Sequence, residues 1–210
     1  MVISEVTAFL EDAFDVLNQK YFEGSLPRAV ITIQSSPKAY GHFTPYEAWF
    51  DNGDGFPEIN LGAETLNRPT ESTIGTLIHE MVHFYCHVNE IKDTSRGGKY
   101  HNKRFKAEAE SRDLIIDYDP RIGWSVTSPS QALIDFVREQ GWSEVSLARM
   151  GLYGLVGGQN GTGTDGGESV AKKKAVSHKY QCPVCKNSVR ATKLVNIGCL
   201  DCNSPMDLVS

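Results

Sequence analysis

Two histidines four residues apart, His79 and His83, carry the clearest chemical signal in this chain, because a glutamate, Glu80, directly follows the first. In an α-helix of about 3.6 residues per turn, the two imidazoles point the same way, one turn apart, and can bind one metal ion. Glu80 lies roughly 100° around the axis, within reach of a water molecule at that metal. This HExxH pattern is typical of zinc hydrolases, and a zinc metalloprotease is the leading prediction.

A catalytic zinc ion needs a third protein ligand, because it is held by three side chains and keeps its fourth position open. The candidates are His101, His87, Cys86 and Glu108. His87 is a further helical turn along, about 6 Å of rise, and Cys86 has the same axial problem, so one helix would not readily converge three ligands. We expect His87 to be a polar helix-end residue and Cys86 a small buried one. His101 follows a loop long enough to fold back and is the favoured ligand.

In this interpretation Glu80 is a general base and not a ligand: it takes the proton of the attacking water and passes it to the leaving amine. The alternative is a chance pattern, with both histidines merely solvated on a helix. The setting favours the metal, since the apolar side of the same segment lies away from His79 and His83. No spacing fixes an oxyanion donor; Tyr100 and His42 are candidates, and a packing or edge-strand role explains each of them better.

The elements that must position these residues follow from hydrophobic periodicity. Residues 3–23 predict an opening amphipathic helix that covers a sheet. Short segments rich in aromatic and β-branched residues predict strands at 29–34, 40–50 and 58–61. Further helices are predicted from Thr70, over 102–112 and over 130–140, with a polar loop at 92–99.

Charge and glycine content divide the 210-residue chain, whose 40% hydrophobic and 10% aromatic composition is that of an ordinary globular protein. Residues 1–170 carry 14 Lys+Arg against 24 Asp+Glu, whereas residues 171–210 carry 7 against 2. Six glycines in 157–167 predict a flexible linker. The predicted domains are a metalloprotease domain at 1–150, the linker at 151–175 and a small module at 176–210.

Two CxxC pairs, Cys182 with Cys185 and Cys199 with Cys202, can wrap one zinc ion in a closed tetrahedron of thiolates. A closed site predicts a structural zinc that decides whether this short segment folds. A redox role is the weaker interpretation, because there are two pairs and no βαβ pattern around them. With Cys86 alone, this cysteine usage favours metal binding in a reducing compartment over a disulfide framework.

Basic residues surround the cysteines and predict a DNA contact, with Tyr180 as the one aromatic residue available for stacking. They are Lys172, Lys173, Lys174, His178, Lys179, Lys186, Arg190 and Lys193. A solvated charged face explains them equally well. No apolar run approaches the roughly 18 residues that cross a bilayer, so we expect a soluble cytoplasmic protein, a location that includes the nucleoid, with no membrane partner.

The segment 76–85, Thr-Leu-Ile-His-Glu-Met-Val-His-Phe-Tyr, followed by His101-Asn-Lys-Arg-Phe105, resembles the SprT-like metalloprotease family, which includes the Spartan proteases. Leu26-Pro27 and 31–43 resemble that family's N-terminal strands. The resemblance covers residues 5 to about 122 and resumes at the C-terminal zinc ribbon. It implies an α+β fold: a compact zincin-like domain with a small antiparallel sheet packed on helices, plus the ribbon.

By that resemblance His79, His83 and His101 would bind the catalytic zinc, and Glu80 would be the catalytic acid and base. Spartan relatives cleave proteins crosslinked to DNA and depend on DNA, so the resemblance implies a DNA-linked protease of DNA repair. This chain departs from them in having a ribbon where they carry motifs for ubiquitin or a replication clamp. It looks closer to the shorter prokaryotic or viral SprT-like proteins.

Three functions are therefore open. The first is a zinc endopeptidase acting on DNA-associated or DNA-crosslinked proteins, and the second is a non-enzymatic adaptor for nucleic acid or protein in which both zinc ions are structural. The third is a zinc hydrolase of small peptides or non-peptide amides. Glu80 favours an enzyme, because a structural site has no use for a carboxylate beside an open coordination position.

Overall fold

The computed structural model describes residues 2–36, 39–142, 144–150 and 177–209. The chain forms two compact units, Met1–Gly166 and Gly167–Ser210, here called the N-terminal and the C-terminal unit. The predicted linker, 151–175, lies outside the described residues, and the predicted domain bounds stay a prediction. None of the described helices is long and apolar enough to cross a membrane.

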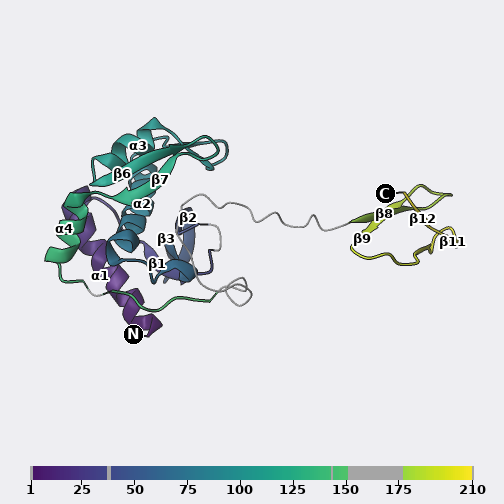
Figure 1. The fold of residues 1–210 in the computed structure, drawn as a ribbon, viewed down its shortest axis with the longest axis horizontal. Helices are drawn as coiled ribbons and strands as arrows, with labels where there is room; N and C mark the ends of the chain where they lie inside the picture. Colours follow the sequence, from purple (N-terminus) through teal and green to yellow (C-terminus); the bar gives the residue numbers. More distant parts are fainter. Residues whose placement is uncertain (1, 37–38, 143, 151–176, 210) are drawn as a thin grey trace. The chain divides into compact units, whose positions relative to one another are not determined.

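The described part of the N-terminal unit combines helices with two small sheets, which confirms the predicted α+β class (Figure 1). Its helices are α1 (Ile3–Phe22), α2 (Thr70–Val88), α3 (Lys103–Glu110) and α4 (Gln131–Glu139), with a 3-10 turn, η1 (Ala63–Thr65). Each α-helix begins within one residue of the predicted position. Side-chain caps set the starts of two of them: in α3 the side chain of Asn102 accepts hydrogen bonds from two backbone N–H groups of the first turn, and in α4 the side chain of Ser130 accepts one from Leu133.

The first sheet consists of β1 (Val30–Gln34), β2 (Gly41–Asp51) and β3 (Asp54–Gly62), in the order β1-β3-β2. The turn at Asn52-Gly53 joins β2 and β3 into an antiparallel hairpin, and both turn residues have positive φ. β1 then pairs with β3 in parallel, so the sheet is mixed. This order leaves β2 at an edge of the sheet.

The second sheet contains strands that sequence reasoning did not predict. It has the order β4-β5-β7-β6, formed by β4 (Thr94–Ser95), β5 (Tyr100–His101), β7 (Gly123–Pro129) and β6 (Leu114–Asp119). The two-residue strands β4 and β5 lie in and beside the predicted polar loop. In β6, Leu114 and Ile116 are buried while Ile115 and Asp117 are exposed, which is the alternation of a strand with one buried face; Tyr118, at an irregularity between Asp117 and Asp119, departs from it. That period of two was readable from the sequence.

Helix α2 is the central element of the N-terminal unit and contacts both sheets and the other three α-helices (Figure 1). Its predicted apolar side is fully buried over Ile74, Leu77, Ile78, Met81 and Val82. Because α2 is enclosed by other elements on several sides, its polar residues Thr73, Thr76 and Glu80 are buried as well. The fold therefore places the HExxH motif between two sheets rather than on a solvated surface.

The C-terminal unit is built from short strands: β8 (His178–Gln181), β9 (Ser188–Ala191), β10 (Gly198–Cys199), β11 (Ser204–Pro205) and β12 (Asp207–Leu208). They form a three-stranded sheet in the order β12-β8-β9 and a β10-β11 pair. The four cysteines follow or lie in these strands. This arrangement is consistent with the predicted zinc ribbon.

Candidate metal centre

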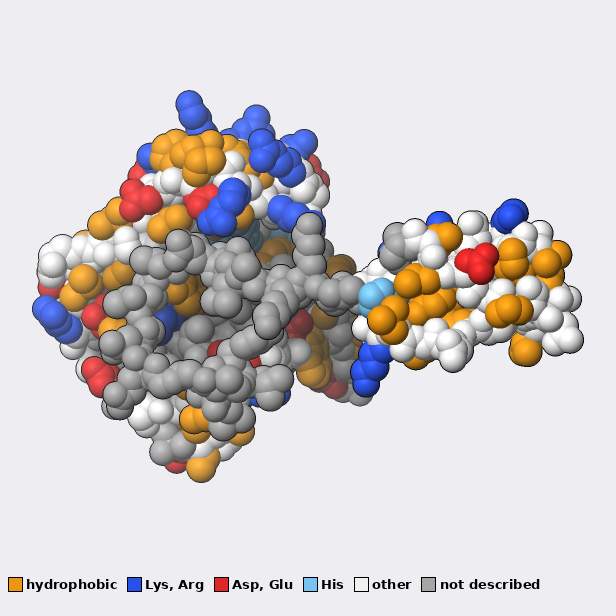
Figure 2. Space-filling model, turned by 45° about the vertical axis from the view of Figure 1, so that its right-hand side comes forward, with side chains coloured by type: hydrophobic (Ala, Val, Ile, Leu, Met, Phe, Trp, Pro, Cys, Tyr) orange, Lys and Arg blue, Asp and Glu red, His pale blue; other side chains and the backbone are white. Residues whose placement is uncertain are grey.

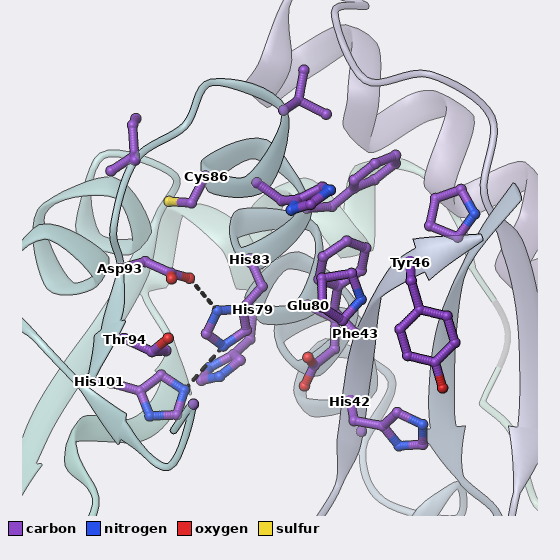
Figure 3. Close-up of a pocket in the computed structure, with 18 of the residues that line it drawn as sticks. His42, Phe43, Tyr46, His79, Glu80, His83, Cys86, Asp93, Thr94 and His101 are labelled. Carbon is purple, nitrogen blue, oxygen red and sulfur yellow. Dashed lines mark hydrogen bonds and ion pairs between the residues drawn. The ribbon is translucent and has the colours of Figure 1, made fainter. Parts of the chain in front are cut away.

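Three histidines from two elements meet at one point of the N-terminal unit (Figure 3). His79 and His83 lie one turn apart on α2, and β5 brings His101 against them. One ring nitrogen of each lies within 4.8 Å of the others, and the Nε2 atoms of His83 and His101 are 2.9 Å apart. The structure thus brings together the three predicted ligands, and this group could hold a metal ion.

The outward-facing ring nitrogen of each histidine has a hydrogen-bond partner. His83 Nδ1 lies 2.5 Å from Asp93 Oδ2, and His101 Nδ1 lies 3.3 Å from the backbone oxygen of Ile122. His79 Nδ1 lies 2.7 Å from the hydroxyl of Thr127, which itself donates to the Ser125 carbonyl. A carboxylate, a carbonyl oxygen and a hydroxyl that has already donated can only accept from the rings. All three imidazoles therefore carry their proton on Nδ1.

With the protons outside, the three Nε2 lone pairs converge on one point. Two lone pairs cannot hydrogen bond to each other, so in these tautomers the 2.9 Å approach of His83 and His101 suits a cation bound between them. Burial lowers the pKa of His101 to about 4 and that of His79 well below its usual range, so both rings stay neutral, as ligands must. Three imidazole nitrogens suit zinc, with room for a fourth ligand.

Phe105 forms the apolar base of this cluster. Its ring centroid lies 4.6 Å from those of His79, His83 and His101, and the side chain is fully buried. α3 carries Phe105, and its N-terminal cap, Asn102, comes directly after His101. The contact restricts the tilt of all three imidazoles, because interiors are close-packed. The predicted His101-Asn-Lys-Arg-Phe105 motif therefore supplies a ligand and its packing together.

Glu80 places its carboxylate beside the histidines but is not one of the converging groups. In the view of Figure 3 the carboxylate lies between the histidines and the strand that carries His42 and Tyr46. The side chain is 6% exposed, and burial raises its pKa to about 7, although a hydrogen bond from the Phe43 backbone acts against the rise. A carboxyl group that exchanges its proton near neutral pH is suited to acid-base work.

A cleft of about 1810 Å³ opens over the histidines and Glu80. One wall comes from β2 and the start of β3, and the other from the segment 91–101. His42, one of the two residues considered as oxyanion donors, lines the cleft. Tyr100, the other, does not face the metal centre: its hydroxyl lies 3.1 Å from that of Tyr118, beside a separate depression.

The remaining candidate ligands are not part of the histidine group, although Cys86 and His87 also line the cleft. Cys86 is fully buried and its thiol pKa is raised to about 12 by burial, so it is a small core residue, as expected. His87 is exposed at the end of α2 against the ring of Phe43. Glu108 forms an ion pair with Arg112 at 2.8 Å. None of these three side chains belongs to the histidine group found among the described residues.

Sequence reasoning missed the residues that orient the ligands, namely Asp93, Thr127 and Gly123. Gly123 pairs with His101 between β7 and β5, with φ at +78°. A Cβ atom there would lie 2.1 Å from the backbone oxygen of His101, so only glycine fits. The close approach arises from the pairing of β5 with β7, and no local sequence pattern predicts that pairing. Asp93 carried a weak signal, as the one acidic residue in a basic loop.

The second metal-binding group lies in the C-terminal unit. Cys182, Cys185, Cys199 and Cys202 place their sulfur atoms within 4.8 Å of one another, close enough to hold one metal ion. Four thiolates leave no open position on a tetrahedral zinc, so such a site is structural. Tyr180, expected to be available for stacking, is 5% exposed, and its hydroxyl accepts a hydrogen bond from the backbone of Val195. That expectation was wrong, because the ring fills the small core of this unit.

An α+β unit in which a central helix and a second sheet bring three imidazoles and a buried carboxylate to one cleft has the features of a metallohydrolase. The sequence profile of the SprT-like family matches residues 10–115, which contain all four of these groups. The chain therefore belongs to the SprT-like family, and its membership suggests a zinc metalloprotease-like function. No curated protein and no solved structure matches the chain.

Replacing Asp93 by Asn should weaken zinc binding at the histidine site by about 10- to 100-fold, since the carboxylate fixes the ring and tautomer of His83. The measurement is a competition titration of the full chain against a chromophoric zinc chelator. Asp117→Asn, at an exposed position on β6, is the matched control. It should leave the zinc affinities of the histidine site and of the cysteine site unchanged. Equal affinities in the two variants would contradict the orienting role of Asp93.

Replacing Gly123 by Ala should displace β5 and lower zinc affinity at the histidine site, because the new methyl group cannot coexist with the His101 carbonyl. Gly97→Ala is the control: Gly97 also has positive φ, +68°, but nothing lies within 4 Å of its Cβ position. Gly97→Ala should lower the free energy of unfolding by only about 1–2 kcal/mol, the cost of placing a residue with a Cβ atom at positive φ. Urea unfolding and zinc titration of both variants measure the difference. Equal losses would show that the contact with His101 is unimportant.

Removing metal with a chelator should unfold the C-terminal unit and leave the N-terminal unit folded. The described apolar side chains buried in the C-terminal unit are only Tyr180, Cys182 and Cys199, whereas the other unit has a continuous core. A two-dimensional amide NMR spectrum of the full chain should lose the dispersed signals of residues 177–209 alone. Retention of those signals after chelation would show that the ribbon folds without metal.

Proposed function

We propose that this protein is a zinc-dependent endopeptidase that hydrolyses peptide bonds of protein substrates, among them proteins bound or crosslinked to DNA. The observation that carries the proposal is the buried carboxylate of Glu80 beside three converging imidazole lone pairs at an open cleft. An adaptor with a structural zinc would have no use for a raised carboxyl pKa next to an incomplete ligand set.

His79, His83 and His101 would hold the catalytic zinc, and Cys182, Cys185, Cys199 and Cys202 the structural one. When bound, the catalytic zinc would polarise the scissile carbonyl and lower the pKa of a water molecule, so that the water can lose a proton and attack the carbonyl carbon at neutral pH. Glu80 would accept a proton from the attacking water on its carboxylate and deliver it to the nitrogen of the leaving amine. Asp93 and Thr127 would hold His83 and His79 in the tautomer with the proton on Nδ1 and correctly turned during this transfer.

The shape of the cleft supports a polypeptide substrate. Its volume exceeds the roughly 300–1,000 Å³ of typical small-molecule pockets. Gly41, His42 and Phe43 of the edge strand β2 line it, so an extended chain could pair with the backbone of β2 while passing the histidines. Gly41 allows close packing here: a Cβ atom would lie 2.8 Å from the Asn60 oxygen and 3.2 Å from the Glu80 side chain.

The basic residues of the C-terminal unit support a DNA contact made through phosphate groups. Lys179, Lys186, Arg190 and Lys193 lie within its described residues, where the acidic residues are Asp201 and Asp207. Since Tyr180 is buried, the unit would use its cations on phosphate groups and would not stack bases through that ring. We infer a tether that is independent of DNA sequence and sensitive to salt.

The zinc-loaded protein should cleave a basic DNA-binding protein, faster with single-stranded DNA present, and Glu80→Gln should reduce the rate by about 10² to 10⁴ while zinc content is retained. Glu71→Gln, at the start of the same helix, is the control and should keep full activity. Fragments are followed by gel electrophoresis and mass spectrometry, with zinc measured on the same samples.

The other outcomes separate the competing functions. Glu80-dependent cleavage that ignores DNA would keep the peptidase and discard the tether. Faster cleavage of short peptides than of the protein substrate would favour a hydrolase of small peptides. A chain that holds two zinc ions and cleaves nothing, with Glu80→Gln indistinguishable from the unmodified protein, would favour the adaptor.

A further inference from the structure

The cleft over the metal centre has an apolar end, between the last turns of α2 and the first sheet. α2 contributes Phe84 and Val88, the segment after it contributes Ile91, and the sheet contributes Phe43 and Pro57. All five side chains line the cleft. Val88 is 43% exposed, and Phe43, Pro57 and Ile91 are partly exposed. We call these five side chains the apolar crevice.

The apolar crevice is continuous with the proposed catalytic group. Glu80, Phe84 and Val88 are spaced by four residues on α2, so they follow one another on nearly the same face, about 6 Å apart along the axis. The backbone of Phe43 donates a hydrogen bond to the Glu80 carboxylate. Figure 3 shows Phe43 on the side of Glu80 away from His101. A peptide whose scissile bond lies at Glu80 and the histidines therefore brings a neighbouring side chain to the crevice.

Ring packing fixes the floor of the apolar crevice. The rings of Phe43 and Phe84 are stacked, with centroids 5.1 Å apart and planes at 28°, and the ring of His87 lies 5.8 Å from that of Phe43. Phe84 is only 2% exposed, so the core holds its ring, and that ring in turn supports Phe43. An apolar surface that is already ordered loses little conformational entropy on binding, and covering it removes apolar area from water.

The cleft has a different character on the side of His101. Thr94, Ser125, Thr127 and the segment 97–99, Gly-Gly-Lys, line the cleft there. Thr94 pairs with His101 between β4 and β5, and the hydroxyl of Thr127 lies against His79, so both belong to the surroundings of the ligands. The two sides of the metal centre thus differ in polarity. We expect a substrate to be selected mainly on one side of its scissile bond.

Apolar side chains are exposed elsewhere too, and Figure 2 shows many of them, in orange, on the C-terminal unit. Leu200, between the cysteines of the second CxxC pair, is 95% exposed. Scattered exposed apolar residues are ordinary on a protein surface. The apolar crevice differs because it lies in a cleft that also contains groups able to do chemistry, which is where ligand sites are usually found.

We propose that the apolar crevice binds a large apolar side chain, that of leucine, methionine or phenylalanine, from the substrate residue next to the scissile bond. This inference rests on the proposed peptidase function and adds the class of residue at which the chain cuts. A charged side chain would lose part of its hydration against Phe43, Val88 and Ile91. A small or polar one would leave the crevice in contact with water. Burying one large apolar side chain corresponds to a preference of about 10- to 100-fold.

The first experiment determines the cleavage sites. The full zinc-loaded chain is incubated with a mixture of peptides from a denatured proteome, and the new ends are identified by mass spectrometry, with Glu80→Gln marking cuts that come from another enzyme. Leucine, methionine and phenylalanine should be enriched at one of the two positions that flank the broken bond. In a matched pair of peptides, replacing that residue by serine should lower kcat/KM about 10- to 100-fold.

Val88→Glu places a carboxylate at the exposed edge of the apolar crevice and should change the preference rather than abolish cleavage. We expect kcat/KM to fall at least about tenfold for the apolar peptide and to rise for the peptide with lysine at the same position. Val16→Glu is the matched control, because Val16 is a 36% exposed valine of α1 outside the cleft, and it should cleave as the unmodified chain does. A misfolded variant would lose activity on both peptides and gain none.

A binding measurement tests the apolar crevice independently of cleavage. Zinc-loaded Glu80→Gln is titrated with a Gly-Ser peptide of about ten residues that carries one central phenylalanine, and with the same peptide without it. In methyl NMR spectra the signals of Val88 and Ile91 should shift with the phenylalanine peptide, at concentrations at least about tenfold lower than with the plain peptide. The signals of Val16 should stay in place.

The outcomes separate this proposal from the proposed peptidase function. Cleavage sites without apolar enrichment, or the same preference in Val88→Glu and Val16→Glu, would overturn the role of the crevice and leave the peptidase. Shifts of the Val88 and Ile91 signals in a protein that cleaves nothing would support the crevice and contradict the peptidase. Val88 and Ile91 signals that do not respond to the phenylalanine peptide would overturn the proposal, whatever activity is measured.

Discussion

The mutual repulsion of three imidazole lone pairs turned toward one point is the constraint on which the rest of the structure depends. Asp93, Thr127 and the Ile122 carbonyl hold the outer nitrogens as donors, so rings that carry a single proton have none left to share between their inner nitrogens. The packing of α2 and α3 holds the three rings together, and a bound metal ion would relieve the repulsion between their lone pairs.

The elements around the three histidines hold them in fixed positions. α2 is buried along nearly its whole length, so its two histidines cannot drift from the core. His101 lies on a strand of only two residues, which is fixed by its pairing with Gly123 and by the ring of Phe105. Glu80 shares the rigid helix with two of the ligands. A proton acceptor at a fixed distance from the reacting atoms is what general-base catalysis requires.

The two units differ in what makes them fold. The N-terminal unit has a continuous apolar core from α1 through α2 to the second sheet, so we expect it to fold without a metal ion. The C-terminal unit buries few side chains among its described residues, so we expect its folding to depend on a metal ion held by the four cysteines. Positive charge is found in both: on the ribbon and on the 92–106 segment beside the cleft. Two separate basic surfaces suit a protein that works next to a polyanion.

The sequence by itself determined the helices, the HExxH pair with its glutamate and the four cysteines, because each depends on short spacings that the helix period or a CxxC turn converts directly into geometry. It favoured His101 for another reason, since the loop before it is long enough to fold back and the family resemblance points to the same residue. The family followed from the same short motifs. Only the tertiary structure decided the parallel pairing of β1 with β3, the β6-β7 hairpin and the roles of Asp93, Thr127 and Gly123. These depend on contacts between segments distant in the chain or on the path of a loop. The buried state of Tyr180 belongs with them, since whether a ring stacks on a ligand or fills a core is decided by its neighbours in space.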